Sequence, residues 1–176
     1  GLDIGSSSIR LLQLSRHGSS YRIDNFAIEP LPPGVIVEKS VQDIEAISEA
    51  IRSAVRNSGS STRHCAVAVS GSAVFTKTIS LPANLAEADI ESQVQIEANQ
   101  YIPYPLEEVS LDFEVLGPVK DNPDMMNVLL AASRTENVDV RVAALDIGGL
   151  ASRVVDVEAF AMENAFKLIS DQLSVP

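Results

Sequence analysis

Alternation of apolar and polar residues predicts strands at the start of the chain. The run from Gly1 to Leu14 has a short apolar segment, a tight turn rich in glycine and serine, and a second apolar segment. This pattern is typical of a buried β-hairpin. Residues 21–28 alternate as a half-buried strand does, and the proline-rich residues 29–34 form a loop. The first three strands are therefore predicted to form an antiparallel meander.

A spacing of three and four residues predicts a helix over residues 40–57, with one buried face. The apolar residues at this spacing are Val41, Ile44, Ile47, Ile51 and Val55. Ser40 is in position to cap the helix, with Asp43 three residues later in a capping-box arrangement. Gly59 is placed to end it.

The rest of the chain alternates between strands and helices. A continuous apolar run predicts a fully buried strand over residues 64–69. Further strands are predicted over residues 75–81, 111–116, 127–132 and 153–157, with a turn at 121–124. Helices are predicted from a cap at Asn84 to about Gln100, from a cap at Thr135, and from about Glu158 onward. The last helix carries one apolar stripe of Ala159, Met162, Phe166, Ile169 and Leu173. Residues 138–142 also alternate, so a strand stays open there.

This order of elements predicts an α/β fold of two parts. Residues 1–72 and 149–176 form one α/β subdomain, and residues 73–148 form a smaller α/β subdomain inserted into it. The strand at 153–157 and the final helix then return to the first part.

Composition narrows the classes of function. The chain has 176 residues and a net charge of −11, which argues against nucleic acid and anionic lipid as partners. No apolar run approaches the roughly 18–20 residues of a membrane span. The chain starts directly in a strand, so we expect no signal peptide and some residues upstream of Gly1. The single Cys65 indicates a reducing cytoplasm. Because the chain has only this cysteine and two histidines, His17 and His64, a zinc site is not expected.

The turn after the first strand is the candidate site. Gly5 permits backbone angles that other residues avoid, and the N–H groups of residues 5–8 point into one small space that suits a phosphate. Asp3 is placed to hold a magnesium ion, through water, beside those phosphates. The turn carries hydroxyls without a lysine, unlike a P-loop. An ordinary hairpin turn is the alternative. In this pattern the turn resembles the first phosphate loop of the actin-like ATPases.

Two other glycine turns have structural explanations. Ser70-Gly71-Ser72 is read as a chain reversal, although it is also able to touch a ligand. Asp146-Ile147-Gly148-Gly149 resembles a second phosphate loop, but a helical stripe precedes it instead of a strand. We therefore interpret its glycines as the end of a helix.

Three further segments carry a resemblance to one family. They are Leu31 to Lys39 (LPPGVIVEK), Glu97 to Phe113 (EANQYIPYPLEEVSLDF) and Val154 to Ala161 (VVDVEAFA). With the opening turn, they are similar to the PilM family of actin-like type IV pilus assembly proteins, which is related in fold to the division protein FtsA. The resemblance extends over essentially the whole chain and corresponds to the amino-terminal half of the family.

The resemblance implies an actin-like (ribonuclease H-like) fold, with residues 1–72 and 149–176 as subdomain 1A and residues 73–148 as subdomain 1C. It implies ATP with magnesium on Asp3, Gly5, Ser6, Ser7 and Ser8. The second phosphate loop and the adenosine-binding part would lie beyond Pro176, so this chain would hold half of the site. Whether Asp156 and Glu158 take part stays open, as do hydrolysis and the catalytic residues.

The resemblance also implies a cytoplasmic protein held at the inner membrane through a partner, with a role in twitching motility. That partner is the amino-terminal tail of a PilN-type membrane protein, bound in a groove between the two subdomains. Other pilus assembly proteins are further expected partners. Residues 101–109 either contact a partner or fasten the end of the preceding helix to its core. Two alternatives to the nucleotide-binding adaptor are a scaffold that needs no nucleotide and a small-molecule kinase of the same superfamily.

Overall fold

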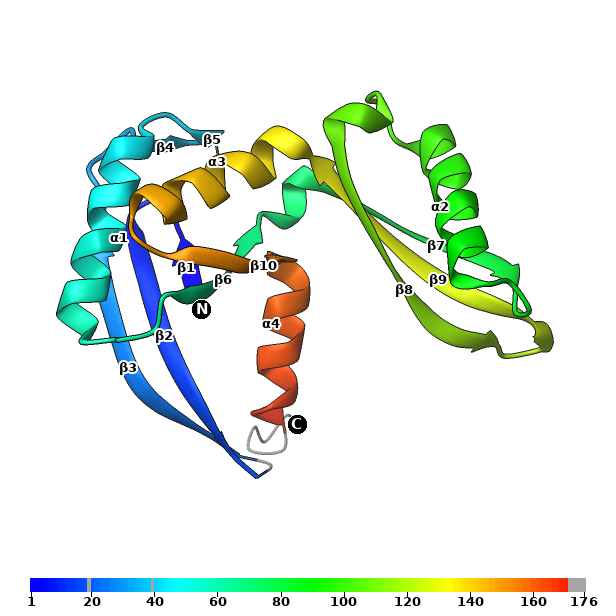
Figure 1. The fold of residues 1–176 in the computed structure, drawn as a ribbon, viewed down its shortest axis with the longest axis horizontal. Coiled ribbons are helices and arrows are strands. Elements are labelled where there is room, and N and C mark those ends of the chain that lie inside the picture. Colours follow the sequence, from blue (N-terminus) through cyan, green and yellow to red (C-terminus); the bar gives the residue numbers. More distant parts are fainter. Residues whose placement is uncertain (19, 39, 171–176) are drawn as a thin grey trace. The chain divides into compact units, whose positions relative to one another are not determined.

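The computed structural model describes residues 1–18, 20–38 and 40–170 (Figure 1). The chain divides into two compact units, the first made of Gly1–Gly71 with Asn137–Pro176 and the second of Ser72–Glu136. Each unit combines strands with helices and has buried residues of its own. The fold is a mixed α/β fold, as the sequence predicts.

An antiparallel meander opens the first unit, as predicted. Its strands are β1 (Leu2–Ile4), β2 (Ser8–His17) and β3 (Ser20–Pro30), in the order β1-β2-β3. Leu11 pairs with Leu2 on one side and with Ala27 on the other, and all three side chains are buried. Helix α1 (Ile44–Ser58) packs against β2 and β3 (Figure 1).

Helix α1 begins later than the sequence predicts. Ser40 is not its cap, because Ser40 pairs with Val37 in a small hairpin of β4 (Ile36–Val37) and β5 (Ser40–Val41). Asp43 is the cap, and its carboxylate accepts a 2.9 Å hydrogen bond from the Ala46 N–H. At the other end Gly59 takes a left-handed conformation with φ of 71°, so this prediction is confirmed.

Two parallel strands complete the first unit. They are β6 (His64–Val69) and β10 (Ala151–Val157), and Ala68 pairs with Asp156 in their register. Strand β1 also lies beside β6. After β10 the chain enters α4 (Glu158–Lys167). Leu173, which was predicted to lie on the stripe of this helix, falls outside the described residues, as do all residues from 171 on.

The second unit is an antiparallel sheet covered by one helix. The sheet has the order β7-β9-β8, made of β7 (Val74–Pro82), β9 (Asn122–Arg134) and β8 (Val109–Val119). Two 3₁₀ turns, Gly71–Ala73 and Leu106–Glu108, precede β7 and β8. Helix α2 (Glu87–Tyr101) lies along the sheet (Figure 1). Its Ile90 and Val94 are buried in one cluster with Val128 and Leu130 of β9. Asn84 does not cap α2, since the cap position is Ala86 and no side chain bonds there.

Helix α3 (Thr135–Ile147) settles two alternatives left open by the sequence. Residues 138–142 are helical, because Ala144 and Leu145 on the same helix are fully buried in the core of the first unit. The Ser48 hydroxyl also donates to the Ala144 carbonyl at 3.2 Å. Residues from Asn137 on therefore belong to the first unit, whereas the order of the elements predicts that residues up to 148 belong to the inserted part.

Candidate functional site

A cavity of about 270 Å³ lies within the first unit. On one side it is lined by the turn between β1 and β2, including Asp3, Gly5, Ser6 and Ser7. The carboxyl ends of the parallel strands β6 and β10 form another side, as is common for ligand sites of α/β sheets. The tertiary structure thus brings four of the five predicted site residues to one cavity. The fifth, Ser8, is buried at the start of β2 and is not part of the lining.

The backbone of the turn offers fewer donors than the sequence predicts. The Gly5 N–H donates to the Ser8 carbonyl at 3.0 Å, so it closes the turn instead of facing a ligand. Within the described part of the chain, the N–H groups of Ser6 and Ser7 donate no hydrogen bond, and both residues are exposed. The donors available to an anion are therefore those of Ser6 and Ser7.

Gly5 is needed for space and not for its backbone angles. It is not one of the glycines with positive φ among the described residues. A β-carbon at this position would lie 3.1 Å from the Ser8 carbonyl oxygen and 3.3 Å from Nη1 of Arg10. Any side chain here would crowd the closing hydrogen bond of the turn and the guanidinium beside it.

Asp3 forms an ion pair with Arg10, which stands opposite it in the β1–β2 register. The Nη1–Oδ2 distance is 2.7 Å, and both side chains are about half exposed, at 54% for Arg10 and 51% for Asp3. Exposed pairs of this kind contribute about 0–1 kcal/mol. The Asp3 carboxylate can therefore exchange Arg10 for another cation at little cost.

The strand-end side of the cavity carries Ser70 and Glu158. The sequence favours a simple chain reversal at residues 70–72, with contact to a ligand as the alternative. In the structure a 3₁₀ turn begins at Gly71, and Ser70 lines the cavity. Glu158 is the first residue of α4 and lines the cavity, whereas Asp156 does not. Asp156 instead accepts a 2.7 Å hydrogen bond from the Val157 N–H.

Arg141 also lines the cavity, and sequence reasoning missed it. Its side chain comes from α3 and is buried, with 7% of the residue exposed. Burial lowers the pKa of its guanidinium, and the nearby Glu158 carboxylate opposes that shift. In the sequence it is a lone arginine among valines at positions 138, 140 and 142, which gave no signal beyond the helical pattern.

The charged lining consists of two carboxylates and two guanidiniums, from Asp3, Glu158, Arg10 and Arg141. Free amides and guanidinium groups suit an oxyanion, and carboxylates suit a hydrated magnesium ion. Among the described residues, no group of three or more His, Cys, Asp or Glu side chains is arranged to hold a metal ion. A magnesium ion here would therefore depend on water and on the ligand's own oxygens.

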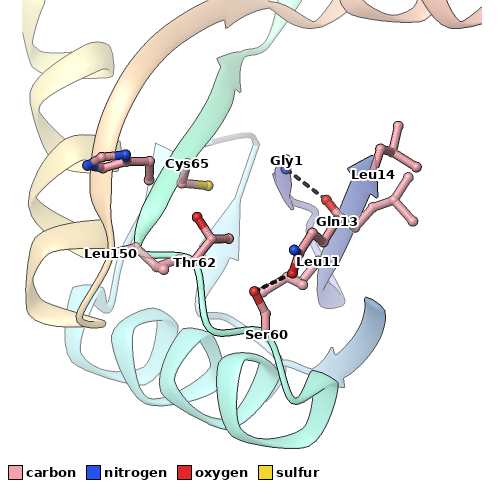
Figure 2. Close-up of a pocket in the computed structure, with 10 residues that line it drawn as sticks. Gly1, Leu11, Gln13, Leu14, Ser60, Thr62, Cys65 and Leu150 are labelled. Carbon is pink, nitrogen blue, oxygen red and sulfur yellow. Dashed lines mark hydrogen bonds between the residues drawn. The ribbon is translucent and has the colours of Figure 1, made fainter. Parts of the chain in front are cut away.

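A second pocket of about 260 Å³ contains none of the predicted site residues (Figure 2). It is lined by β2 from Leu11 to Leu14, by the segment before β6, and by Cys65 and Leu150. The Ser60 hydroxyl donates to the Gln13 side-chain oxygen, a hydrogen bond of 2.7 Å that is dashed in Figure 2. The Gly1 nitrogen donates to the Leu12 carbonyl at 2.8 Å. Burial raises the pKa of the Cys65 thiol, which makes it a poor nucleophile.

Comparison with known proteins shows which protein family the chain resembles. The family model described as "Type IV pilus assembly protein PilM" matches residues 1–175. A solved "PilM-PilN type IV pilus biogenesis complex" contains a chain that is 32% identical, with a TM-score of 0.81. The match covers 92% of this chain and 47% of that one, so this chain spans about half the length of the solved protein.

The cytoplasmic domain of EpsL, an inner membrane component of the type II secretion system of Vibrio cholerae, is similar in fold. It is 16% identical, with a TM-score of 0.56, and the match covers 91% of this chain and 57% of that one. In the described part of the chain, no helix has the length and apolar character needed to cross a membrane.

Proposed function

The chain belongs to the PilM family of type IV pilus assembly proteins, and from this we propose that it supplies one wall of an ATP site in an actin-like assembly adaptor. The observation that carries this proposal is the cavity that joins the Asp3–Ser7 turn to the ends of β6 and β10. Its free amides and balanced charges fit the phosphates of a nucleotide that arrives with a divalent cation.

In this proposal each residue of the turn has a separate role. The N–H and hydroxyl groups of Ser6 and Ser7 donate to phosphate oxygens, and Gly5 keeps the turn closed through its bond to Ser8. Asp3 leaves Arg10 and accepts hydrogen bonds from the water shell of magnesium. The phosphates of the bound nucleotide are the negatively charged acceptors for these donors.

We further propose that a PilN-type amino-terminal tail is the partner of this protein and holds it at the inner membrane. The support is that the solved relative is described as a complex of PilM with PilN. Nucleotide state would then bias partner binding by stabilising one arrangement of the full-length protein over another.

A scaffold that needs no nucleotide is the second candidate, and one observation favours it. Asp3 is already paired with Arg10, and the charges of the cavity lining balance without any ligand. In that case the turn would serve only to connect β1 to β2, and partner binding would not respond to ATP.

Titration of the full-length protein with ATP and magnesium separates the two candidates. We expect Asp3→Ala to weaken binding about tenfold or more, as for loss of a charge-assisted contact. Asp24→Ala is the matched control, since Asp24 also pairs with an arginine of the same sheet, at 2.9 Å from Arg22, but does not line the cavity. Equal binding by wild type and Asp3→Ala would show that the phosphate role is wrong.

A second titration, with a PilN-type tail peptide, tests the partner. If the protein binds no ATP and binds the peptide equally well with and without ATP, it is the scaffold that needs no nucleotide. A folded protein that does not bind the peptide would contradict the proposed partner.

A further inference from the structure

Arg141 combines deep burial with a position at the cavity. Only 7% of the residue is exposed, and no carboxylate of the described residues forms an ion pair with it. Its Nε donates to the Ala68 carbonyl at 3.1 Å and its Nη1 to the Asn137 carbonyl at 2.7 Å. The two backbone carbonyls hold the guanidinium in place, and the Glu158 carboxylate acts on its charge from nearby without forming an ion pair with it.

Such an arrangement is costly unless a ligand uses it. An arginine side chain stays protonated, and burying its charge without a carboxylate or another anion in direct contact is unfavourable. A guanidinium has five N–H donors in a rigid fork, and the two carbonyl acceptors leave part of that fork unused. The unused part belongs to a side chain that lines the same cavity as Ser6 and Ser7.

We propose that Arg141 binds the phosphate oxygens of the ligand in this cavity and is its principal protein cation. The inference rests on the proposed nucleotide function and adds to it a cavity-lining residue from α3. Ala68, which accepts the Nε bond, is two residues before Ser70, so the same bond ties the guanidinium to the strand end that lines the cavity.

Arg10 is less suited to this role. Its side chain is 54% exposed and already bonded to Asp3, so solvent and that carboxylate both weaken its attraction for a phosphate. Arg141 is fixed at two points before any ligand arrives, so little conformational entropy is lost on binding. A planar guanidinium is also the group best matched to the paired oxygens of a phosphate.

Because the cavity also contains carboxylates, we expect phosphate binding in it to require a divalent cation. Asp3 and Glu158 offset the charges of Arg10 and Arg141, so a phosphate without a cation would meet no net positive charge. We therefore expect Arg141 to act on the magnesium complex of ATP, with weaker binding when magnesium is chelated.

The test is a calorimetric titration of the full-length protein with ATP and magnesium. We expect Arg141→Gln to weaken binding about tenfold to a hundredfold, as for loss of hydrogen bonds to a charged group. Arg141→Lys keeps the charge but loses the planar fork, so its binding should fall between those of wild type and Arg141→Gln. Circular dichroism and thermal unfolding establish that each variant is folded.

Arg52→Gln is the matched control. Arg52 also donates to a backbone carbonyl of α3, that of Ile147 at 2.8 Å, but it does not line the cavity. A folded Arg141→Gln variant that binds like wild type and Arg52→Gln would overturn the inference, and a loss of binding with Asp3→Ala would leave the proposed function standing. A wild-type protein that binds no ATP would overturn both.

A measurement on wild type keeps the inference falsifiable if the Arg141 variants do not fold. The side-chain Nε–Hε signal of Arg141, followed by nitrogen-15 NMR, is expected to shift on addition of ATP and magnesium and to stay in place with magnesium alone. A signal that does not respond to the nucleotide, while the signals of Ser6 and Ser7 do, would contradict a contact with the phosphates.

Discussion

Gly148 lies against Ile51 so closely that no side chain fits between them. A β-carbon built on Gly148 would stand 2.6 Å from Cγ2 of Ile51 and 2.9 Å from its Cβ. Ile51 belongs to α1 and is fully buried, and Gly148 follows the last residue of α3. The glycine therefore lets the end of one helix approach the other, and Gly149, with φ of 85°, ends the helix. The interpretation of this Asp-x-Gly-Gly sequence as a helix end is confirmed.

Gly148→Ala is predicted to destabilise the fold by about 1–3 kcal/mol, the usual cost of overpacking a core. Urea unfolding measures the change. Combining it with Ile51→Ala should cost less than the sum of the two single variants, because the second change removes the Cγ2 atom that the new methyl group meets. Additive costs would show that the contact is not the cause.

Asp43→Ala is predicted to destabilise α1 by about 1 kcal/mol, because the Ala46 N–H loses its acceptor. Ser40→Ala is the matched control and should change stability by less than about 0.5 kcal/mol, because Ser40 lies on a short exposed strand. Chemical denaturation of the two variants checks the prediction. A larger cost for Ser40→Ala would restore the capping box that the sequence predicts.

Leu130→Ala and Ile47→Ala are predicted to act on different units. Both side chains are fully buried, Leu130 in the cluster of the second unit and Ile47 in that of the first. Each change should cost about 2–5 kcal/mol. Hydrogen exchange should accelerate mainly in the sheet β7-β9-β8 for Leu130→Ala and mainly in β2, β3 and α1 for Ile47→Ala. Equal acceleration throughout by both variants would contradict separate cores.

Cys65 is predicted to react slowly with iodoacetamide, because burial raises the pKa of its thiol and limits access. The folded state keeps the thiol protonated while the unfolded chain loses the proton near pH 8.5. Stability from this group is thus fully present below that pH and falls as the pH rises toward the folded value. Cys65→Ala should lack this part of the alkaline decline. Alkylation as fast as in the unfolded chain would contradict burial of the thiol.

Local patterns determined most of the elements. A period of two gave the meander and the strands, a period near 3.6 gave the helices, and Gly59 and Gly149 marked two helix ends. These features can be predicted from the sequence because each depends on residues close together in the chain. The first residues of helices were harder to predict, because several nearby polar residues are able to cap a helix. Ser40 and Asn84 were predicted as caps, but the cap positions are Asp43 and Ala86.

The sequence by itself determined the family, the order of the elements and the turn that places Asp3 and Ser6 at a candidate site. Only the tertiary structure decided which other residues line the cavity beside that turn. The pairing of β6 with β10 and the packing of α3 bring Ser70, Arg141 and Glu158 to the same cavity. Those residues are far apart in the chain, and hydrophobic periodicity reports only which face of an element is buried. Which polar side chain is carried inward with that face depends on long-range packing.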